Sequence, residues 1–405
     1  MIDTSTIKTT NKDVQKVNML AYLLSYVGFM TLTLSMSLTP LLANTIHVNH
    51  STTQIAMSLS FFMFSISAVI FATLSDIFTA RKVLFIAQCL SITGLILLSI
   101  SHDIYSMYIG FVIVGIGTGC YASISRAIIS RNSTDKIQMK SAIAVISCCI
   151  IIAPVISTYL ALVFIPISWR LAYVIMAIIE ISLLLYSLPT LRTDAKKQVL
   201  ILKTDILSGF KHALSQPTYV LNIITVAVLF SFYLGVLMSS FKGLIIDEFK
   251  LPISYFTILF LATSLIYILG IFSYRFRSHV SHKKRYNLGI LIIIFVATMY
   301  YTFAQTNAIH IIQPLHIICY LIGFLAPLAT GNAMATISKG HGSAAAMVTF
   351  AVSFCMAIWE YLRAHLQLSD YNFILLAIWV TLGTVTALKI IGIIIDNRTN
   401  KNQIL

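Results

Sequence analysis

The stretch TQIAMSLSFFMFSISAVIFATLSDIFTARKVL occupies residues 53–84. Residues 53–75 contain no Asp, Glu, Lys or Arg, and about 20 consecutive apolar residues are enough for a helix to cross the hydrocarbon core of a bilayer. Asp76, Arg81 and Lys82 come directly afterwards, as expected where a chain leaves the membrane into a short loop. The stretch therefore predicts a transmembrane helix followed by a charged turn.

Long uncharged runs of the same kind recur along the chain. Hydrophobic residues make up 58% of the 405 residues and charged residues 10%, with mean hydropathy +0.91, which excludes a water-soluble globular protein and a disordered chain. The runs are continuous, whereas the strands of a transmembrane β-barrel alternate apolar and polar residues. We expect an all-α membrane protein. Charged residues are absent from residues 17–75, 141–169, 212–241, 251–274 and 286–338.

The number and grouping of the helices follow from these runs. The apolar content is sufficient for about a dozen spans of roughly 20 residues. The longest polar connector, residues 190–217, holds five Lys and Arg residues and divides the spans six and six. We expect an N-terminal segment 1–18, a six-helix bundle 19–189, the linker 190–217, a second six-helix bundle 218–395 and a tail 396–405. The twelve expected helices are residues 19–42, 53–74, 83–100, 105–129, 141–163, 169–189, 218–241, 253–274, 287–304, 312–337, 343–363 and 371–395.

The positive charges indicate the orientation. Short loops rich in Lys and Arg stay in the cytoplasm. If the N-terminus is cytoplasmic, the outer connectors hold only Arg170, Lys242, Lys250 and Arg363 of the 27 Lys and Arg residues. We therefore expect both termini in the cytoplasm. The net charge of +14 is spread over short loops and does not form the single basic face that binds nucleic acid, so no nucleic-acid partner is expected.

The sequence shows no sign of a metal or cofactor. All six cysteines lie in predicted helices, without metal-ligand spacing. Gly115, Gly117 and Gly119 lie inside an apolar span with no strand before them, so they indicate close helix packing, not a dinucleotide-binding loop. We expect no cofactor.

Residues 53–84 resemble, without gaps, the corresponding stretch of major facilitator superfamily transporters, most closely the Bcr/CflA-type drug/proton antiporters. The matching residues are Gln54, Leu74, Ser75, Asp76, Phe78, Arg81, Lys82 and Val83, and later Arg126-Ala127, Ala153-Pro154, Trp169-Arg170 and Pro327. The resemblance implies two six-helix bundles that rock about a midplane site and open it to each side in turn. It also implies a monomeric multi-pass protein of a bacterial inner membrane, with a small-molecule substrate and a proton as partners.

Several family positions differ in this chain. An acidic residue four before a Pro is common in the first helix of the family, but here Met36 precedes Pro40. The Gly, Arg and Gly of the loop motif are Ala72, Ile77 and Thr79. Further departures are Phe111, Val114, Ser157-Thr158 and Lys242. The missing carboxylate removes a site for cationic drugs, so an anionic substrate competes with drug efflux.

The charged turn after residue 75 predicts a conformational latch. Asp76 ends one helix, and Arg81 and Lys82 follow one loop later, so the carboxylate can pair with cations in one conformation only. The alternative is that the two cations hold the loop in the cytoplasm and Asp76 only caps a helix.

Three residues are candidates for proton coupling. Glu180 lies near the middle of the sixth predicted helix, where a carboxyl is either protonated or paired. Glu360 lies near the outer end of the eleventh, where it can also stay solvated. His316 in the tenth helix titrates near neutral pH unless it is a hydrogen-bonded packing residue.

Polar side chains on several helices predict a central pocket. Thr31 and Ser35 lie one turn apart on the first helix, and Arg126 lies near the inner end of the fourth, where it either holds an anion or reaches the headgroups. Single Ser and Thr residues also serve helix association. The predicted cavity residues are Thr31, Ser35, Gln54, Tyr121, Arg126, Tyr233, Tyr320 and Asn332, and the predicted packing residues are Gly115, Gly117, Gly119, Pro154 and Pro327.

These observations predict a secondary transporter that moves a small molecule by alternating access, coupled to protons and similar to drug-efflux proteins. The alternative is import or export of an anionic metabolite such as a carboxylate siderophore. A membrane enzyme is not expected, because no nucleophile, base and acid are grouped at suitable spacing. A non-transporting receptor would usually carry a soluble signalling domain, and no terminal segment here is long enough for one.

Overall fold

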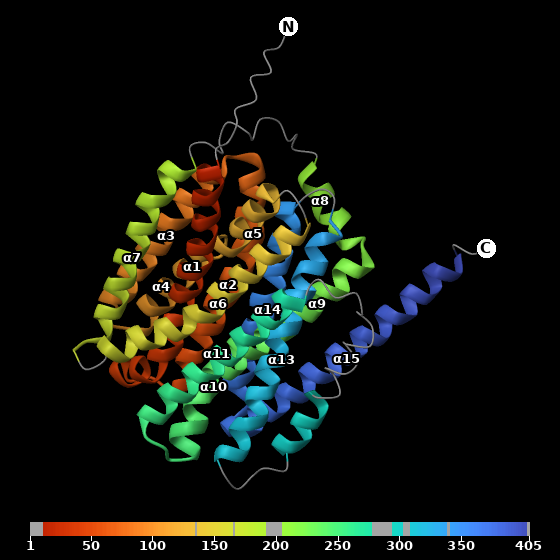
Figure 1. Ribbon diagram of the computed structural model, residues 1–405. Helices are drawn as coiled ribbons and strands as arrows, with labels where there is room; N and C mark the ends of the chain where they lie inside the picture. The colour runs from red at the N-terminus through yellow and green to blue at the C-terminus, as the bar shows by residue number, and fades with distance from the viewer. Residues whose placement is uncertain are drawn as a thin grey trace.

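The computed structural model describes residues 11–133, 136–164, 167–191, 205–277, 294–302, 308–337 and 341–402, and every regular element in them is a helix (Figure 1). The first half of the chain, called the N-half, consists of α1 (Asn11–Ile46), α2 (His50–Ile77), α3 (Ala80–Ile100), α4 (Ile104–Thr118), α5 (Tyr121–Asn132), α6 (Lys136–Phe164) and α7 (Trp169–Thr190). The linker contains α8 (Asp205–Leu214). The C-half consists of α9 (Pro217–Ser231), η2 (Phe232–Leu237), α10 (Met238–Lys242), η3 (Gly243–Glu248), α11 (Ile253–Arg277), helical residues 294–302, α13 (Ala308–Ala335), α14 (His341–Leu366) and α15 (Asp370–Asn402).

The described helices are long enough for a membrane protein. Ten stretches are long and apolar enough to cross a bilayer, and α11 contains a shorter apolar stretch, Ile258–Tyr274. The expected helix 287–304 is described only over residues 294–302, which are helical. The prediction of an all-α membrane protein is confirmed.

The fourth predicted helix is interrupted. Residues 105–129 were expected to form one helix, but a turn at Gly119 and Cys120 separates α4 from α5. A Cβ atom on Gly119 would lie 2.5 Å from the backbone oxygen of Phe64 in α2. Glycine permits this close approach, and its weak helix propensity favours an interruption.

Other helix limits also differ from the expected ones. The seventh span was expected to end at residue 241 but continues to Glu248 through α10 and two π-helical stretches, so Lys242 lies within a helix and not in a connector. The linker is partly helical, and α8 buries Ala213. The first and last helices extend beyond the bilayer-spanning stretches, α1 from Asn11 and α15 to Asn402.

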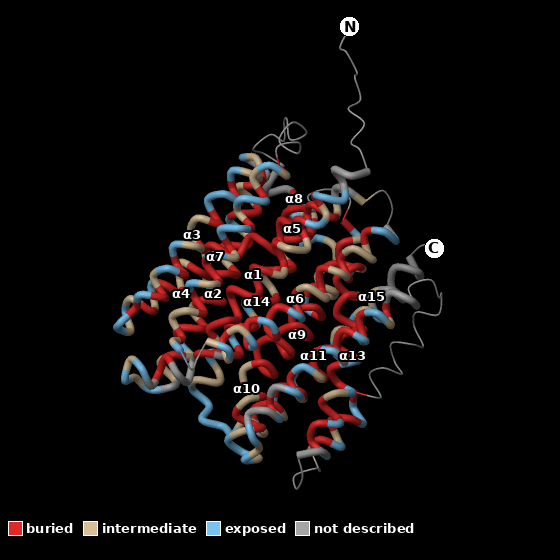
Figure 2. The backbone as a smooth tube through the Cα atoms, turned by 60° about the vertical axis from the view of Figure 1, so that its left-hand side comes forward, coloured by how far each residue is buried: buried red, intermediate tan, exposed pale blue. Residues whose placement is uncertain are grey.

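The two halves meet along several pairs of helices, two of which show how the halves are related. α2 packs along α14, and α6 packs along α11. With α4 and α5 counted as one helix, the second and fifth helices of the N-half contact the fifth and second helices of the C-half. This exchange is what a twofold relation between two similar six-helix bundles produces. Figure 2 shows that the buried residues concentrate on the faces turned toward the interior of this arrangement.

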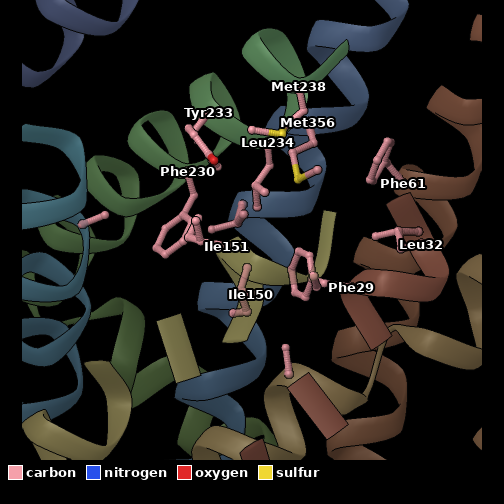
Figure 3. Packing of buried hydrophobic residues seen from close by; sticks show 14 of the residues in the cluster. Phe29, Leu32, Phe61, Ile150, Ile151, Phe230, Tyr233, Leu234, Met238 and Met356 are labelled. Carbon is pink, nitrogen blue, oxygen red and sulfur yellow. The ribbon is translucent and has the colours of Figure 1, made fainter. Parts of the chain in front are cut away.

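The molecule has two ends, which we name by their contents. α8 and the first residues of α1 lie at the linker end, at the top of Figure 1, whereas α10 lies toward the opposite end, called the pocket end. Between the two ends, apolar side chains from both halves point toward one another (Figure 3). Phe29 and Phe61 come from the N-half, and Leu234 and Met356 from the C-half, and all four are buried.

Candidate functional site

A cavity of about 210 Å³ lies between the two halves at the pocket end. The N-half contributes Met36, Gln54 and Met57 from α1 and α2, and the C-half contributes Phe256 and Phe260 from α11. The exposed Asp247 also lines the cavity, so it reaches the surface of the molecule at this end. Thioether and aromatic side chains therefore form the apolar part of its wall.

Five charged residues from the C-half line the same cavity. Arg363 of α14 forms an ion pair with Asp370 at the start of α15 and also donates to the hydroxyl of Ser240. Lys242 forms no ion pair among the described residues, although Asp247 lies close enough to act on its charge. Glu360 is only 3% exposed, and its Oε1 atom has no hydrogen-bond partner in the described part of the chain. The expectation that Glu360 can stay solvated is therefore wrong, because α14 turns its side chain into the protein.

The linker end is bridged by hydrogen bonds between the halves. Arg126 of α5 donates from Nη1 to Oγ1 of Thr349 in α14 at 2.6 Å. Lys140 of α6 donates from Nζ to Oδ1 of Asn332 in α13 at 3.2 Å. Arg126 is 4% exposed and so does not reach toward the headgroups. We call the interface between the two halves the seam. The cavity thus lies at one end of the seam, and hydrogen bonds join the halves at the other end.

Residues 19–400 match the profile of the Major Facilitator Superfamily. The chain belongs to this superfamily. The structure resembles that of the proton:xylose symporter XylE, with a TM-score of 0.74 and 11% identity over 93% of this chain and 94% of that one. It also resembles the human organic anion transporter MFSD10 (TETRAN), with a TM-score of 0.66 and 12% identity over 92% and 99% of the two chains. At these identities the likeness shows the fold alone. No curated protein matches the sequence.

Inside the N-half of this superfamily member, Glu180 forms a second polar centre. The side chain is completely buried, and its Oε1 accepts hydrogen bonds from Thr31 at 2.8 Å and Ser91 at 3.0 Å. Its Oε2 accepts from Tyr121 at 2.9 Å. The three donors come from α1, α3 and α5, and among the described residues no cation pairs with the carboxyl. Glu180 therefore joins four helices through hydroxyl groups only.

Most of the predicted cavity residues lie outside the cavity. Of these residues, only Gln54 lines it. Ser35 bonds to Tyr173 within the N-half, and Tyr233 donates to Ser264 within the C-half. Tyr320 is 36% exposed and donates to Ser273 of α11 on the outer surface, because its face of α13 points away from the seam.

Other predicted residues, namely His316, the three latch residues and the two prolines, are also not among the described residues that line the cavity. His316 bonds through Nε2 to Thr263 inside the C-half. Asp76 lies at the end of α2, and its side chain is outside the described residues; Arg81 and Lys82 lie in the first turn of α3. Pro154 and Pro327 lie inside α6 and α13.

The three glycines lie at close contacts between helices. A Cβ atom on Gly115 would lie 2.3 Å from the backbone oxygen of Ser60, and one on Gly117 would lie 2.3 Å from the backbone nitrogen of Ser91. Both contacts leave no room for a side chain.

Four of the charged cavity residues, Lys242, Asp247, Arg363 and Asp370, were not predicted as site residues. Lys242 and Arg363 were assigned to outer connectors because they interrupt or end uncharged runs. The signal that could have found Lys242 is that one turn of apolar residues, Gly243 to Ile246, follows it before Asp247. A helix that continues through these residues carries the lysine into the protein.

Proposed function

We propose that this chain is a secondary transporter that carries a small solute through the membrane by alternating access. The observation that supports the proposal is the combination of a cavity between the halves at the pocket end with hydrogen bonds between the halves at the linker end. Rocking of the two halves about their seam would close the first end and open the second. The cavity would then face each side of the membrane in turn.

Distances between spin labels on the purified protein in liposomes test this proposal. After replacement of the six native cysteines, one label pair is placed on the exposed Tyr105 and Tyr255 at the pocket end, and another on the exposed Ile137 and Leu214 at the linker end. Alternating access predicts two populations in each pair, with opposite changes at the two ends. A single fixed distance at both ends under every gradient and solute would rule out transport by this mechanism.

Proton coupling through Glu180 is part of the proposal. An ionised Glu180 accepts from all three hydroxyls, and a protonated Glu180 donates to one of them, which can turn its own hydrogen elsewhere. The site can therefore hold or release a proton without displacement of a heavy atom. Glu180→Gln should abolish accumulation driven by a pH gradient and leave solute exchange intact; unchanged accumulation would remove Glu180 from this role. Glu360 and His316 are the next residues to test in the same assay.

Two substrate classes are each favoured by a different charged residue of the cavity. Drug/proton antiport of the Bcr/CflA type is favoured by the buried Glu360, which supplies a carboxylate for an organic cation. Transport of an anionic metabolite is favoured by Lys242, which has no ion pair in the described part of the chain. Arg126→Ala should weaken transport of an anion more than that of a neutral solute, and equal weakening would reject an anion path. The cavity is smaller than the roughly 300–1,000 Å³ of drug-sized pockets, which argues against a siderophore in this conformation.

Orientation and the latch complete the proposal. The positive-inside distribution supports a bacterial inner membrane protein with both termini in the cytoplasm, so the linker end would face the cytoplasm. Labels on Lys211 and Lys250 should then react from opposite sides of intact cells.

Asp76, with Arg81 and Lys82, would latch the linker end in one state. Asp76→Asn should then change the distribution of linker-end distances and leave the fold intact.

A further inference from the structure

Two oppositely charged residues of the cavity, Lys242 and Glu360, form no ion pair with any residue that the structure describes. Arg363 forms its ion pair among the described residues with Asp370, although it also lies close enough to act on the charge of Glu360. Lys242 has no ion pair among the described residues, and the exposed Asp247 acts on it only from a distance. Glu360 is buried with one carboxyl oxygen unpartnered in that part of the chain.

The two unpaired groups come from different helices of the C-half. Lys242 ends α10, and Glu360 lies on α14, which packs against η2 and carries Met356 next to Gly235. Apolar side chains complete the cavity, with Met36 and Met57 on the N-half side and Phe256 and Phe260 on the C-half side. A solute here meets the Lys242 ammonium group and the Glu360 carboxyl, beside the Arg363–Asp370 ion pair, together with these apolar side chains.

We propose that the substrate is a small zwitterion with an apolar body, whose anionic group binds Lys242 and whose ammonium group binds Glu360. This inference rests on the proposed transport function and narrows its substrate class. A zwitterion also accounts for both charged residues, Glu360, which favoured an organic cation, and Lys242, which favoured an anion.

A solute with one charge fits the cavity less well. An organic cation would satisfy Glu360 and leave Lys242 with no ionic partner, whereas an anion would satisfy Lys242 and leave the buried carboxyl. A charge in a largely desolvated cavity is stabilised only when it is paired and hydrogen-bonded. A zwitterion pairs both groups at once, and its two ends cancel, so the cavity gains no net charge.

Matched sets of compounds test the proposal on the intact protein. Phenylalanine, phenethylamine and hydrocinnamate share one aromatic skeleton. Phenylalanine carries both charges, phenethylamine carries the ammonium group only, and hydrocinnamate carries the carboxylate only. Leucine, isoamylamine and isocaproate form a second set with an aliphatic skeleton. Binding is measured by the rise in thermal stability in detergent, and transport by exchange in liposomes.

The expected result is a pattern across compounds and variants. In at least one set the zwitterion binds about tenfold or more tightly than either singly charged member. Glu360→Gln weakens the zwitterion and the amine about tenfold and leaves the acid unchanged, and Lys242→Gln weakens the zwitterion and the acid and leaves the amine unchanged. Lys389→Gln is the control, because Lys389 is a half-buried lysine of α15 that does not line the cavity.

Two kinds of failure are distinguishable. If singly charged members bind as tightly as the zwitterions, or if none of the six compounds binds while the label distances still alternate, the zwitterion assignment is wrong and the transport function stands. If the distances at both ends never change, the transport function itself is wrong.

Discussion

Tyr121 donates a hydrogen bond of 2.9 Å to Oε2 of Glu180, which joins the first residue of α5 to the middle of α7. The ring of Tyr121 also packs against Gly28 of α1, where an added Cβ atom would lie 2.8 Å from its Cδ2. Five residues further along α5, Arg126 donates to Thr349 of the other half. A short chain of contacts therefore runs from the buried carboxyl to the bridge at the linker end.

Tyr121→Phe should separate the carboxyl from α5. The substitution removes one of three donors to Glu180, and loss of a hydrogen bond to a charged group costs about 1.5–3 kcal/mol. We expect a lower thermal stability and a reduction of about tenfold or more in gradient-driven accumulation. Thermal unfolding and accumulation in liposomes measure the two effects.

The matched control is Tyr173→Phe. Tyr173 is also fully buried in the N-half, and its hydroxyl bonds to Ser35, so its loss should lower stability in a similar way. It should leave the dependence of accumulation on the pH gradient unchanged, because Tyr173 does not touch Glu180. Equal effects of the two variants on this dependence would mean that Tyr121 has only a packing role.

The helices were predictable because a bilayer admits few alternatives. Runs without charge indicated most of the spans, although the fourth expected helix is interrupted at Gly119 and the seventh continues to Glu248. The resemblance at residues 53–84 indicated the superfamily. The faces of the helices were not predictable from one sequence, because helix rotation is set by packing against neighbours. Tyr320 and Tyr233 were both expected in the cavity, yet one lies on the outer surface and the other bonds to Ser264. Lys242 was missed because the uncharged run ends there, and uncharged runs alone did not show that the helix continues past it to Glu248.

Thr349→Val should weaken the bridge at the linker end. The variant removes the oxygen that accepts from Arg126 Nη1 and leaves a buried guanidinium with one hydrogen bond fewer, at a cost of about 1–3 kcal/mol. The cost falls on the conformation described here, so the population should shift toward an open linker end. Spin-label distances between Ile137 and Leu214 measure the shift. Thr330→Val is the control, because the buried Thr330 donates to the backbone oxygen of Ala326 in its own helix and bonds to no other described residue. An equal shift in both variants would contradict the assignment.

Asp103 should contribute a pH-dependent part of the stability at the pocket end. Its carboxylate caps α4 by accepting from the backbone N–H groups of Ser106 and Tyr105. These bonds, with that of Ser106 the strongest, lower the pKa of Asp103 below its ordinary value. Since the folded pKa lies below the unfolded one, this stabilisation is complete above the unfolded pKa and is lost as pH falls through the folded pKa.

Substitution of Asp103 by Asn tests this expectation. Asn still caps the helix but does not titrate in this range. The difference in Tm between the wild type and Asp103→Asn should therefore be present at neutral pH and shrink as the pH is lowered. Asp103→Ala loses the cap and should be less stable than Asn throughout. A difference between wild type and Asn that is independent of pH would contradict the role of the charge.

Gly117→Ala should disturb the Glu180 centre through the backbone. The new Cβ atom would lie 2.3 Å from the backbone nitrogen of Ser91 and 2.8 Å from the backbone oxygen of Ala87, and neither is a flexible side-chain end. α3 and α4 must therefore move apart, at a cost of about 1–3 kcal/mol for overpacking. Because Ser91 donates to Glu180 at 3.0 Å, the movement also weakens that bond.

The control for this variant is Gly383→Ala in α15, where no described atom beyond the adjacent backbone of its own helix lies within 4 Å of the added Cβ. In a helix, alanine is favoured over glycine by about 0.5–1 kcal/mol, so this variant should be slightly more stable than the wild type. Opposite shifts in Tm, with a loss of gradient-driven accumulation in Gly117→Ala alone, are expected. If Gly117→Ala keeps both its stability and its accumulation, α3 and α4 do not need this close contact, and Ser91 does not hold the carboxyl in place.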